Sequence, residues 1–318
     1  DFYTRFVFTD GLRTKYWVDL DGDDVEDADD QVTTYTHGTT KGATAGDSKI
    51  QTGHLVQKIT YPEGEDPTFA YNAQSQQIWR KDDDGNVIET EFTNGGRLAH
   101  ERATTIVAGY DSAVERITRA YDNLGRPQTV TQYDDDVVGS GSVVNEVKNT
   151  YDDWGMVSKI EQDHDSAIGG TLLYDVDFTY AKATSGRNTI RRSTMDLPNG
   201  DTVNYTYTND TTHDDSDASR VTQVGIDTGS GNVVQATYAY NGVGQVVGTN
   251  LDPVDVMWHQ YTTSGTYPDL DRFDRVTSSR WTKDLSTDRD FYDVDITYDR
   301  NGNITLLEDN VHFDANSK

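Results

Sequence analysis

The residues best suited to chemistry lie in one acidic stretch near the beginning of the sequence, at residues 19–30. Counted from Asp19 as position one, carboxylates fall at positions one, three, five, nine and twelve. A tight loop with this spacing can surround a single Ca²⁺ ion with oxygen ligands. Calcium is the one cofactor for which the sequence offers a hypothesis, and the predicted ligands are Asp19, Asp21, Asp23, Asp27 and Asp30.

A second interpretation of this acidic stretch stays open. Calcium loops of this kind carry a glycine at the position of Asp24, because the chain turns sharply there. Runs of like charge are also common on surfaces that bind only water. The stretch is therefore predicted to be either a calcium loop or the exposed acidic tip of a hairpin.

The remaining titratable residues do not indicate a catalytic centre. The seven histidines are scattered without the spacing of a zinc-binding helix, and the sequence has neither a Gly-x-Ser-x-Gly elbow nor a phosphate-binding loop. His164 and His213 each precede an aspartate, but both pairs are predicted in solvated loops. We predict no catalytic residue and no enzyme activity. The alternative is a polysaccharide-acting enzyme, which needs two carboxyl groups at a defined separation in a cleft.

A short sequence pattern recurs along the chain and determines its predicted architecture. It consists of an aromatic residue, Asp or Asn, two free positions, Gly, and then usually Arg, Asn or Gln. Clear copies occupy residues 121–126, 151–155, 240–245 and 298–303, and worn copies occupy 71–76, 81–86 and 92–97. Asp or Asn opens a type I turn by bonding its own backbone, and Gly adopts the left-handed conformation. Each copy is predicted to close a β-hairpin through a three-residue loop with a glycine bulge.

The hairpin register predicts which residues face one another. Asp299 pairs with Asn303 beside the turn, and one step farther out Tyr298 lies opposite Ile304. The corresponding pairs elsewhere are Asp122–Arg126, Phe92–Leu98, Tyr151–Val157 and Tyr240–Val246. The residues that define the repeat are Tyr121, Asp122, Gly125, Arg126, Tyr151, Asp152, Gly155, Tyr240, Gly244, Tyr298, Asp299 and Gly302.

The segments between the turns alternate as β-strands do. At residues 175–180, 203–207 and 293–298, apolar or aromatic residues alternate with polar ones, which is typical of strands with one dry and one wet face. No segment has a convincing apolar stripe at helical spacing. The predicted fold class is all-β, with repeated antiparallel β-hairpins that form a continuous curved or spiralling sheet.

Composition limits the partners. The chain has 318 residues, no Cys, 34% hydrophobic residues, 19 Tyr and a formal net charge of −28. The lack of Cys excludes disulfides, zinc–thiolate sites and cysteine nucleophiles. The acidity argues against nucleic acid as a partner, because phosphate binding requires clustered Lys and Arg, and it disfavours anionic membranes. Tyrosine suits a thin two-sided sheet, since its ring is buried while its hydroxyl stays bonded.

The repeated Tyr-Asp-x-x-Gly-Arg core and the segment 267–276 resemble the RHS/YD-repeat family of large bacterial secreted and cell-surface proteins, Tc-toxin shells and teneurins. The resemblance implies a YD-repeat shell or tube, as a single array over residues 1–318. Residues 1–54 are its divergent part and residues 55–318 its recognisable repeats. It also implies an internal fragment of a longer extracellular, secreted or cell-surface protein. There the chain is a structural shell or scaffold that encapsulates or presents a C-terminal domain.

The expected partners are the protein's own C-terminal cargo domain or other copies of itself, without membrane insertion. The alternative function is an extracellular adhesive or fibre-forming repeat module that binds glycans, cells or other copies. Exposed aromatic residues would bind the glycans, although packing within the sheet is the competing role for most of them. The candidates are Trp79, Trp154, Trp258 and Trp281.

Overall fold

The structure is a computed structural model. It describes residues 3–20, 22–23, 25–27, 30–64, 66–170, 173–182, 190–208, 218–260, 266–283 and 289–311. These residues form antiparallel β-strands and a single 3₁₀ turn, η1 (Asp252–Val254), without an α-helix in the described ranges. The all-β prediction is confirmed. No helix in this part of the chain has the length and apolarity of a membrane span.

The chain divides into two compact units, one of Asp1–Thr150 with Ile160–Tyr174 and the other of Tyr151–Lys159 with Asp175–Lys318. The first unit contains β1 (Tyr3–Thr9), β2 (Leu12–Asp19), β3 (Gln31–Thr39), β4 (Thr52–Thr60), β5 (Thr68–Tyr71), β6 (Gln77–Lys81), β7 (Val87–Phe92), β8 (Leu98–Thr105), β9 (Arg116–Tyr121), β10 (Pro127–Tyr133) and nearly all of β11 (Val143–Tyr151). Strand β12 (Val157–Asp163) contributes to both units.

The second unit follows the same plan. Its strands are β13 (Leu173–Lys182), whose first residues belong to the other unit, β14 (Ile190–Asp196), β15 (Thr202–Tyr207), β16 (Val221–Asp227), β17 (Asn232–Tyr240), β18 (Val246–Leu251), β19 (Val256–His259), β20 (Ser278–Lys283), β21 (Arg289–Tyr298) and β22 (Ile304–Asp309).

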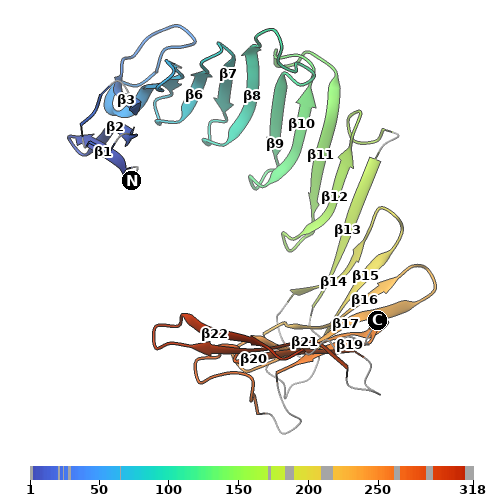
Figure 1. Ribbon diagram of the computed structural model, residues 1–318. Helices are drawn as coiled ribbons and strands as arrows, with labels where there is room; N and C mark the ends of the chain where they lie inside the picture. The colour runs from blue at the N-terminus through green and yellow to red at the C-terminus, as the bar shows by residue number, and fades with distance from the viewer. Residues whose placement is uncertain are drawn as a thin grey trace. The chain divides into compact units, whose positions relative to one another are not determined.

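Each unit is a meander, in which a strand pairs with the strands just before and after it in the chain. In the first unit this holds from β1 to β11, and Figure 1 shows β6 to β11 following one another in chain order. In the second unit it holds from β13 to β22. Hairpins added one after another are the architecture that the repeated turn pattern predicts.

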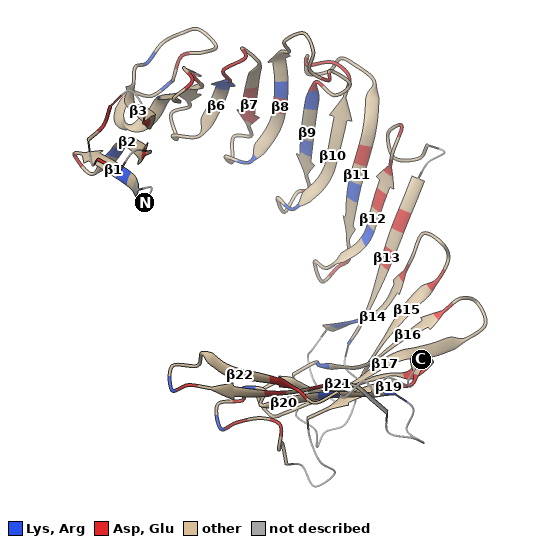
Figure 2. Cartoon of the chain, in the orientation of Figure 1, with Lys and Arg blue, Asp and Glu red and all other residues tan. Residues whose placement is uncertain are grey.

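The apolar core is very thin. Among the described residues, the buried apolar side chains are Trp17, Ala70, Ala236, Val247 and Val294. Every residue of β22 is exposed, including Ile304, Leu306 and Leu307. Figure 2 shows acidic residues both in the loops and on strands such as β11, β12 and β13, and Lys and Arg on β8, β9 and β11. A sheet without a second layer needs other contacts to hold one hairpin on the next.

Candidate functional site

The repeated turn has one hydrogen-bonding scheme, which Asp299 illustrates. Its amide donates to the carbonyl of Asn303 at 2.9 Å, and the Gly302 amide donates to the Asp299 carbonyl at 3.1 Å. Oδ1 of Asp299 accepts the amides of Asn301 and Asn303 at 2.9 and 2.8 Å. Asp opens the motif because its carboxylate satisfies amides that the turn leaves without a strand partner.

The predicted register is confirmed at three of the turns. Tyr298 pairs with Ile304, Tyr240 with Val246, and Phe92 with Leu98. The Asp122 carboxylate lies 2.6 Å from Nε of Arg126. The turn glycines have positive φ angles of 79° at Gly125, 83° at Gly155, 93° at Gly244 and 89° at Gly302.

Two further copies of the turn escaped the sequence pattern. At residues 271–275, the Asp271 amide donates to the Arg275 carbonyl at 2.9 Å, and Asp274 takes the glycine position with φ of 59°. Leu270 stands in place of the aromatic residue and faces Val276. At 197–201, the Leu197 amide donates to the Asp201 carbonyl at 2.8 Å. Leu197 therefore occupies the position that Asp or Asn holds in the other copies. A search for the backbone requirement, rather than for Tyr-Asp, could have found the first copy.

Tyrosine hydroxyls connect several hairpins to the one before. In six places a tyrosine hydroxyl donates to a main-chain carbonyl on an earlier strand or just before the strand begins. The pairs are Tyr71 to Val56 (2.7 Å), Tyr121 to Leu98 (2.8 Å), Tyr180 to Val157 (3.0 Å), Tyr207 to Arg192 (2.9 Å), Tyr240 to Val221 (2.7 Å) and Tyr298 to Val276 (2.9 Å). All six tyrosines are half-buried. The predicted bonded hydroxyl is therefore present at these six tyrosines, and their rings are partly rather than fully buried.

Four of these tyrosines are also covered by an arginine that comes just before the accepting carbonyl. The guanidinium carbon lies over the ring centroid in the pairs Arg97–Tyr121 (5.7 Å), Arg191–Tyr207 (5.1 Å), Arg220–Tyr240 (5.6 Å) and Arg275–Tyr298 (4.4 Å). Such contacts contribute about 0.5–1 kcal/mol each at exposed positions. We call the combination of this hydroxyl bond and this ring contact a Tyr–Arg rung.

The turn glycine is required for a second reason besides its positive φ, because the arginine of a Tyr–Arg rung packs against it. Nη1 of Arg220 donates to the Asn241 carbonyl at 2.9 Å, so the arginine of one hairpin reaches the turn of the next. A methyl group on Gly244 would lie 3.1 Å from Nη2 of Arg220, and one on Gly125 would collide with the guanidinium of Arg97. Glycine at this position lets consecutive turns stack.

A cluster of carboxylates lies at one polar cleft in the second unit. Asp269, Asp293 and Asp295 line a cavity of about 510 Å³ together with His259 and Arg280. Asp293 lies opposite Arg280 across β20 and β21. Burial raises the pKa of Asp269, and the neighbouring Asp295 and Asp293 raise it further. Asp269 can therefore hold a proton at a higher pH than an ordinary Asp.

The acidic stretch is organised by its own backbone. Oδ1 of Asp19, a buried residue, accepts the Gly22 amide at 2.6 Å, and Asp30 accepts the amides of Leu20 and Asp27 at 3.1 and 3.2 Å. Asp21 lies outside the described residues. Within the described ranges, no three carboxylates or histidines gather to hold a metal ion. The calcium loop stays a prediction.

The other predicted candidates are scattered. The His164 ring contacts Tyr174 edge-on at 5.4 Å, and the pair at His213 lies outside the described residues. Trp154 is exposed within its turn, whereas Trp258 and Trp281 stack on each other across two strands at 6.0 Å. These positions form no common site.

Comparisons with known proteins identify the fold. No family model and no curated protein sequence matches this chain. Among solved structures, it is similar to TcdB2-TccC3, with a TM-score of 0.53 and 12% identity, over 96% of this chain and 15% of that chain. It is also similar to the Tc holotoxin pore of Photorhabdus luminescens, with a TM-score of 0.51 and 13% identity over the same shares. TcdB2-TccC3-Cdc42 gives a TM-score of 0.51 and 12% identity, over 94% and 15%. The chain therefore has a β-repeat fold like that of part of these Tc toxin chains.

Proposed function

We propose that this chain is a structural segment of a β-shell in a larger secreted or cell-surface protein of the RHS/YD-repeat type. In this proposal, residues 1–318 belong to one array that encloses or presents a C-terminal cargo domain. The fold likeness to Tc toxin chains supports the proposal, and this chain spans only about 15% of their length. Non-enzymatic scaffolding accounts for the structural features without requiring a reaction.

The observation that carries the proposal is the Tyr–Arg rung. Rungs join one hairpin to the preceding one at Tyr121, Tyr207, Tyr240 and Tyr298, where the apolar core is nearly absent. Contacts between neighbouring hairpins allow a sheet to extend by repetition, as in other repeat proteins. A wall one sheet thick has two accessible faces, which suits a container better than a globular enzyme.

The exposed strand β22 supports a further part of the proposal. Its apolar residues Ile304, Leu306 and Leu307 are 56%, 53% and 59% exposed. An apolar edge strand tends to pair with another chain segment. We expect it to be covered by further strands of the same shell, and the alternative is head-to-tail contact with another copy in a fibre.

Electron microscopy of the full natural protein tests this function. The expected result is that the segment forms part of a wall around a lumen that protects the C-terminal domain from protease. A solid globular particle without a lumen, or a filament of docked copies, would contradict the shell. The calcium part is tested separately, because titration with millimolar Ca²⁺ should release heat in the parent protein and much less in Asp19→Asn.

The enzyme alternative has its own test at the carboxylate cleft. If the cleft were catalytic, the protein would hydrolyse a polysaccharide, and Asp269→Asn and Asp293→Asn would abolish this activity. The scaffold proposal predicts no turnover of a panel of neutral and acidic polysaccharides. It also predicts that Asp269→Asn stabilises the protein at neutral pH. The folded pKa of Asp269 is raised, so the free energy of unfolding falls as the pH rises through that pKa, and Asn has no charge to bury.

A further inference from the structure

In the first unit, β8 with β9 and β6 with β7 are paired only at the end far from the turns at 71–76, 92–97 and 121–126. The turn at 81–86 joins β6 to β7 at their paired end. Between β8 and β9 the register covers His100–Arg102 and Arg116–Thr118, and between β6 and β7 it covers Trp79–Lys81 and Val87–Glu89. Away from the paired end, each such pair leaves a gap between its strands. A Tyr–Arg rung closes the gap between β8 and β9, since Tyr121 reaches the Leu98 carbonyl beneath Arg97.

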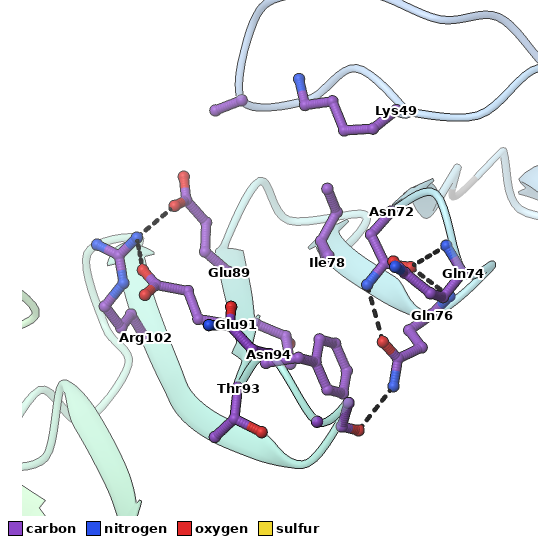
Figure 3. Close-up of a pocket in the computed structure, with 15 residues that line it drawn as sticks. Lys49, Asn72, Gln74, Gln76, Ile78, Glu89, Glu91, Thr93, Asn94 and Arg102 are labelled. Atoms are coloured by element: carbon purple, nitrogen blue, oxygen red, sulfur yellow. Dashed lines mark hydrogen bonds and ion pairs between the residues drawn. The ribbon is translucent and has the colours of Figure 1, made fainter.

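The gap between β6 and β7 lacks the rung because both of its residues differ. Phe92 occupies the place of the tyrosine and has no hydroxyl to donate, and Gln76 occupies the place of the arginine. The Gln76 side chain still reaches the next turn, donating to the Gly96 carbonyl at 2.9 Å, and it accepts from Asn72 at 2.8 Å. The gap remains open as a cavity of about 790 Å³, within the usual size of a small-molecule site (Figure 3).

The lining of this cavity combines apolar and amide groups. Ile78 and Phe92 supply apolar surface. Gln74 and Asn94 come from the two turns that flank the gap, and Figure 3 shows them around the opening with Asn72 and Gln76. A side-chain amide presents both a donor and an acceptor, so it can bond a hydroxyl group in either direction.

The charges of the lining cancel, unlike those of the whole chain. The cavity has two cations, Lys49 and Arg102, and two anions, Glu89 and Glu91, whereas the protein carries −28 overall. Nη2 of Arg102 lies 2.7 Å from Glu89 and 2.8 Å from Glu91, and Nζ of Lys49 donates to the Thr44 carbonyl at 2.8 Å. Each charge is already paired or hydrogen-bonded, so a charged ligand would gain no net attraction.

From this cavity we infer that the chain binds a neutral saccharide where the missing rung leaves β6 and β7 apart. A pyranose ring has hydroxyl groups at its edge and apolar C–H groups on its faces. Amides at the rim fit the hydroxyl groups, and Ile78 with Phe92 fits a face of the ring. Saccharide binding at this cavity is independent of the shell function and would add recognition to a scaffold.

Calorimetric titration of the whole chain tests the site with a defined panel. The probes are neutral oligosaccharides of glucose, galactose, mannose and N-acetylglucosamine, compared with sialylated and sulfated ones. Phe92→Tyr restores the missing hydroxyl, which should bridge β6 and β7 across the gap and narrow the cavity, and Asn94→Ala removes a rim amide. The matched controls are Tyr121→Phe, which removes the hydroxyl of the neighbouring rung, and Asn123→Ala, the equivalent position of the next turn.

The inference predicts that at least one neutral oligosaccharide binds and that Phe92→Tyr and Asn94→Ala each weaken binding about ten-fold or more. The two controls should bind like the parent protein. The inference is overturned if no neutral probe binds, if only charged probes bind, or if both cavity variants bind like the controls. Thermal melts of Asn94→Ala, an exposed turn residue, show whether any loss reflects unfolding.

Discussion

In strands β8–β11, the connections at the two ends of the strands are stabilised in different ways. At one end, residues 122–126 form a short turn that satisfies its own backbone and stacks under Arg97. At the other end, residues 134–142 form a longer loop folded around Arg116, which is 2% exposed. Arg116 donates to the carbonyls of Asp135 (2.6 Å), Val137 and Ser140 (2.7 Å). The hydrogen bonds of the turn recur in other hairpins, whereas the loop at 134–142 is held by the single buried side chain of Arg116.

The largest expected effect is at the loop end. Arg116→Met keeps the length of the side chain but removes all three hydrogen bonds that this buried cation donates to the loop, so we expect a loss of about 3 kcal/mol in the free energy of unfolding. Arg119→Met on the same strand is the control, because its ion pair with Glu101 at 2.6 Å is partly exposed and contributes less than about 1 kcal/mol. Denaturant unfolding measures both, and equal losses would refute the distinction.

The next effect separates the two roles of the turn glycine. Gly125→Ala should cost about 1–2 kcal/mol for the left-handed backbone, plus a further cost for displacing Arg97. Gly229→Ala has a similar φ of 92° but open space around the added methyl group, so it isolates the backbone cost. Thermal melts compare the two variants. If Gly229→Ala costs as much as Gly125→Ala, stacking of consecutive turns contributes nothing.

Removal of a single rung hydroxyl should have a smaller effect. Tyr298→Phe loses the hydrogen bond to the Val276 carbonyl and should cost about 1 kcal/mol. Tyr292→Phe on the same strand is the control, since that ring is 45% exposed and makes no rung. We expect Tyr292→Phe to leave the free energy of unfolding unchanged in the same measurement, and a cost equal to that of Tyr298→Phe would contradict a specific role for the rung hydroxyl.

The smallest effect is the pH dependence of the turn carboxylates. Hydrogen bonds from the Asn303 side chain and amide hold the pKa of Asp299 below its ordinary value of about 4. Its contribution to stability is therefore complete above that value and is lost as the pH falls through the folded pKa. The stability difference between the parent protein and Asp299→Asn should shrink below about pH 4. A difference that grows on acidification would show that the sign is wrong.

The sequence predicted the turns well because their requirements are local. Asp299, Gly302 and Asn303 lie within five residues, so their types alone reveal the hydrogen bonds. The rungs were harder to predict, because Tyr240 bonds a carbonyl 19 residues earlier and Tyr121 one 23 residues earlier. The separation along the chain ranges from 15 residues at Tyr71 and Tyr207 to 23 at Tyr121, because the loops between the partners differ in length. The loop around Arg116 has no local signal, since its acceptors are backbone carbonyls.

The cavity between β6 and β7 shows the same limit. Phe92 and Gln76 are visible in the sequence as departures from the repeat, but only the rung reveals that they leave a gap unfilled. The carboxylate cleft at Asp269 likewise depends on strand register, because Asp293 and Asp295 come from β21 and Asp269 from the segment before β20.

The most direct test of the account is a double-mutant cycle on the rung of Arg275 and Tyr298, whose guanidinium carbon and ring centroid lie 4.4 Å apart. Arg275→Met, Tyr298→Leu and the double variant are compared by denaturant unfolding, and the Asp271–Arg275 ion pair is lost equally in both branches of the cycle. If the rung joins the two hairpins, the coupling free energy between Arg275 and Tyr298 should be about 1 kcal/mol. In a control cycle that combines Arg275→Met with Tyr292→Leu, the two losses in the free energy of unfolding should be additive. If the rung cycle is additive within about 0.3 kcal/mol, hairpins are not held together by Tyr–Arg rungs.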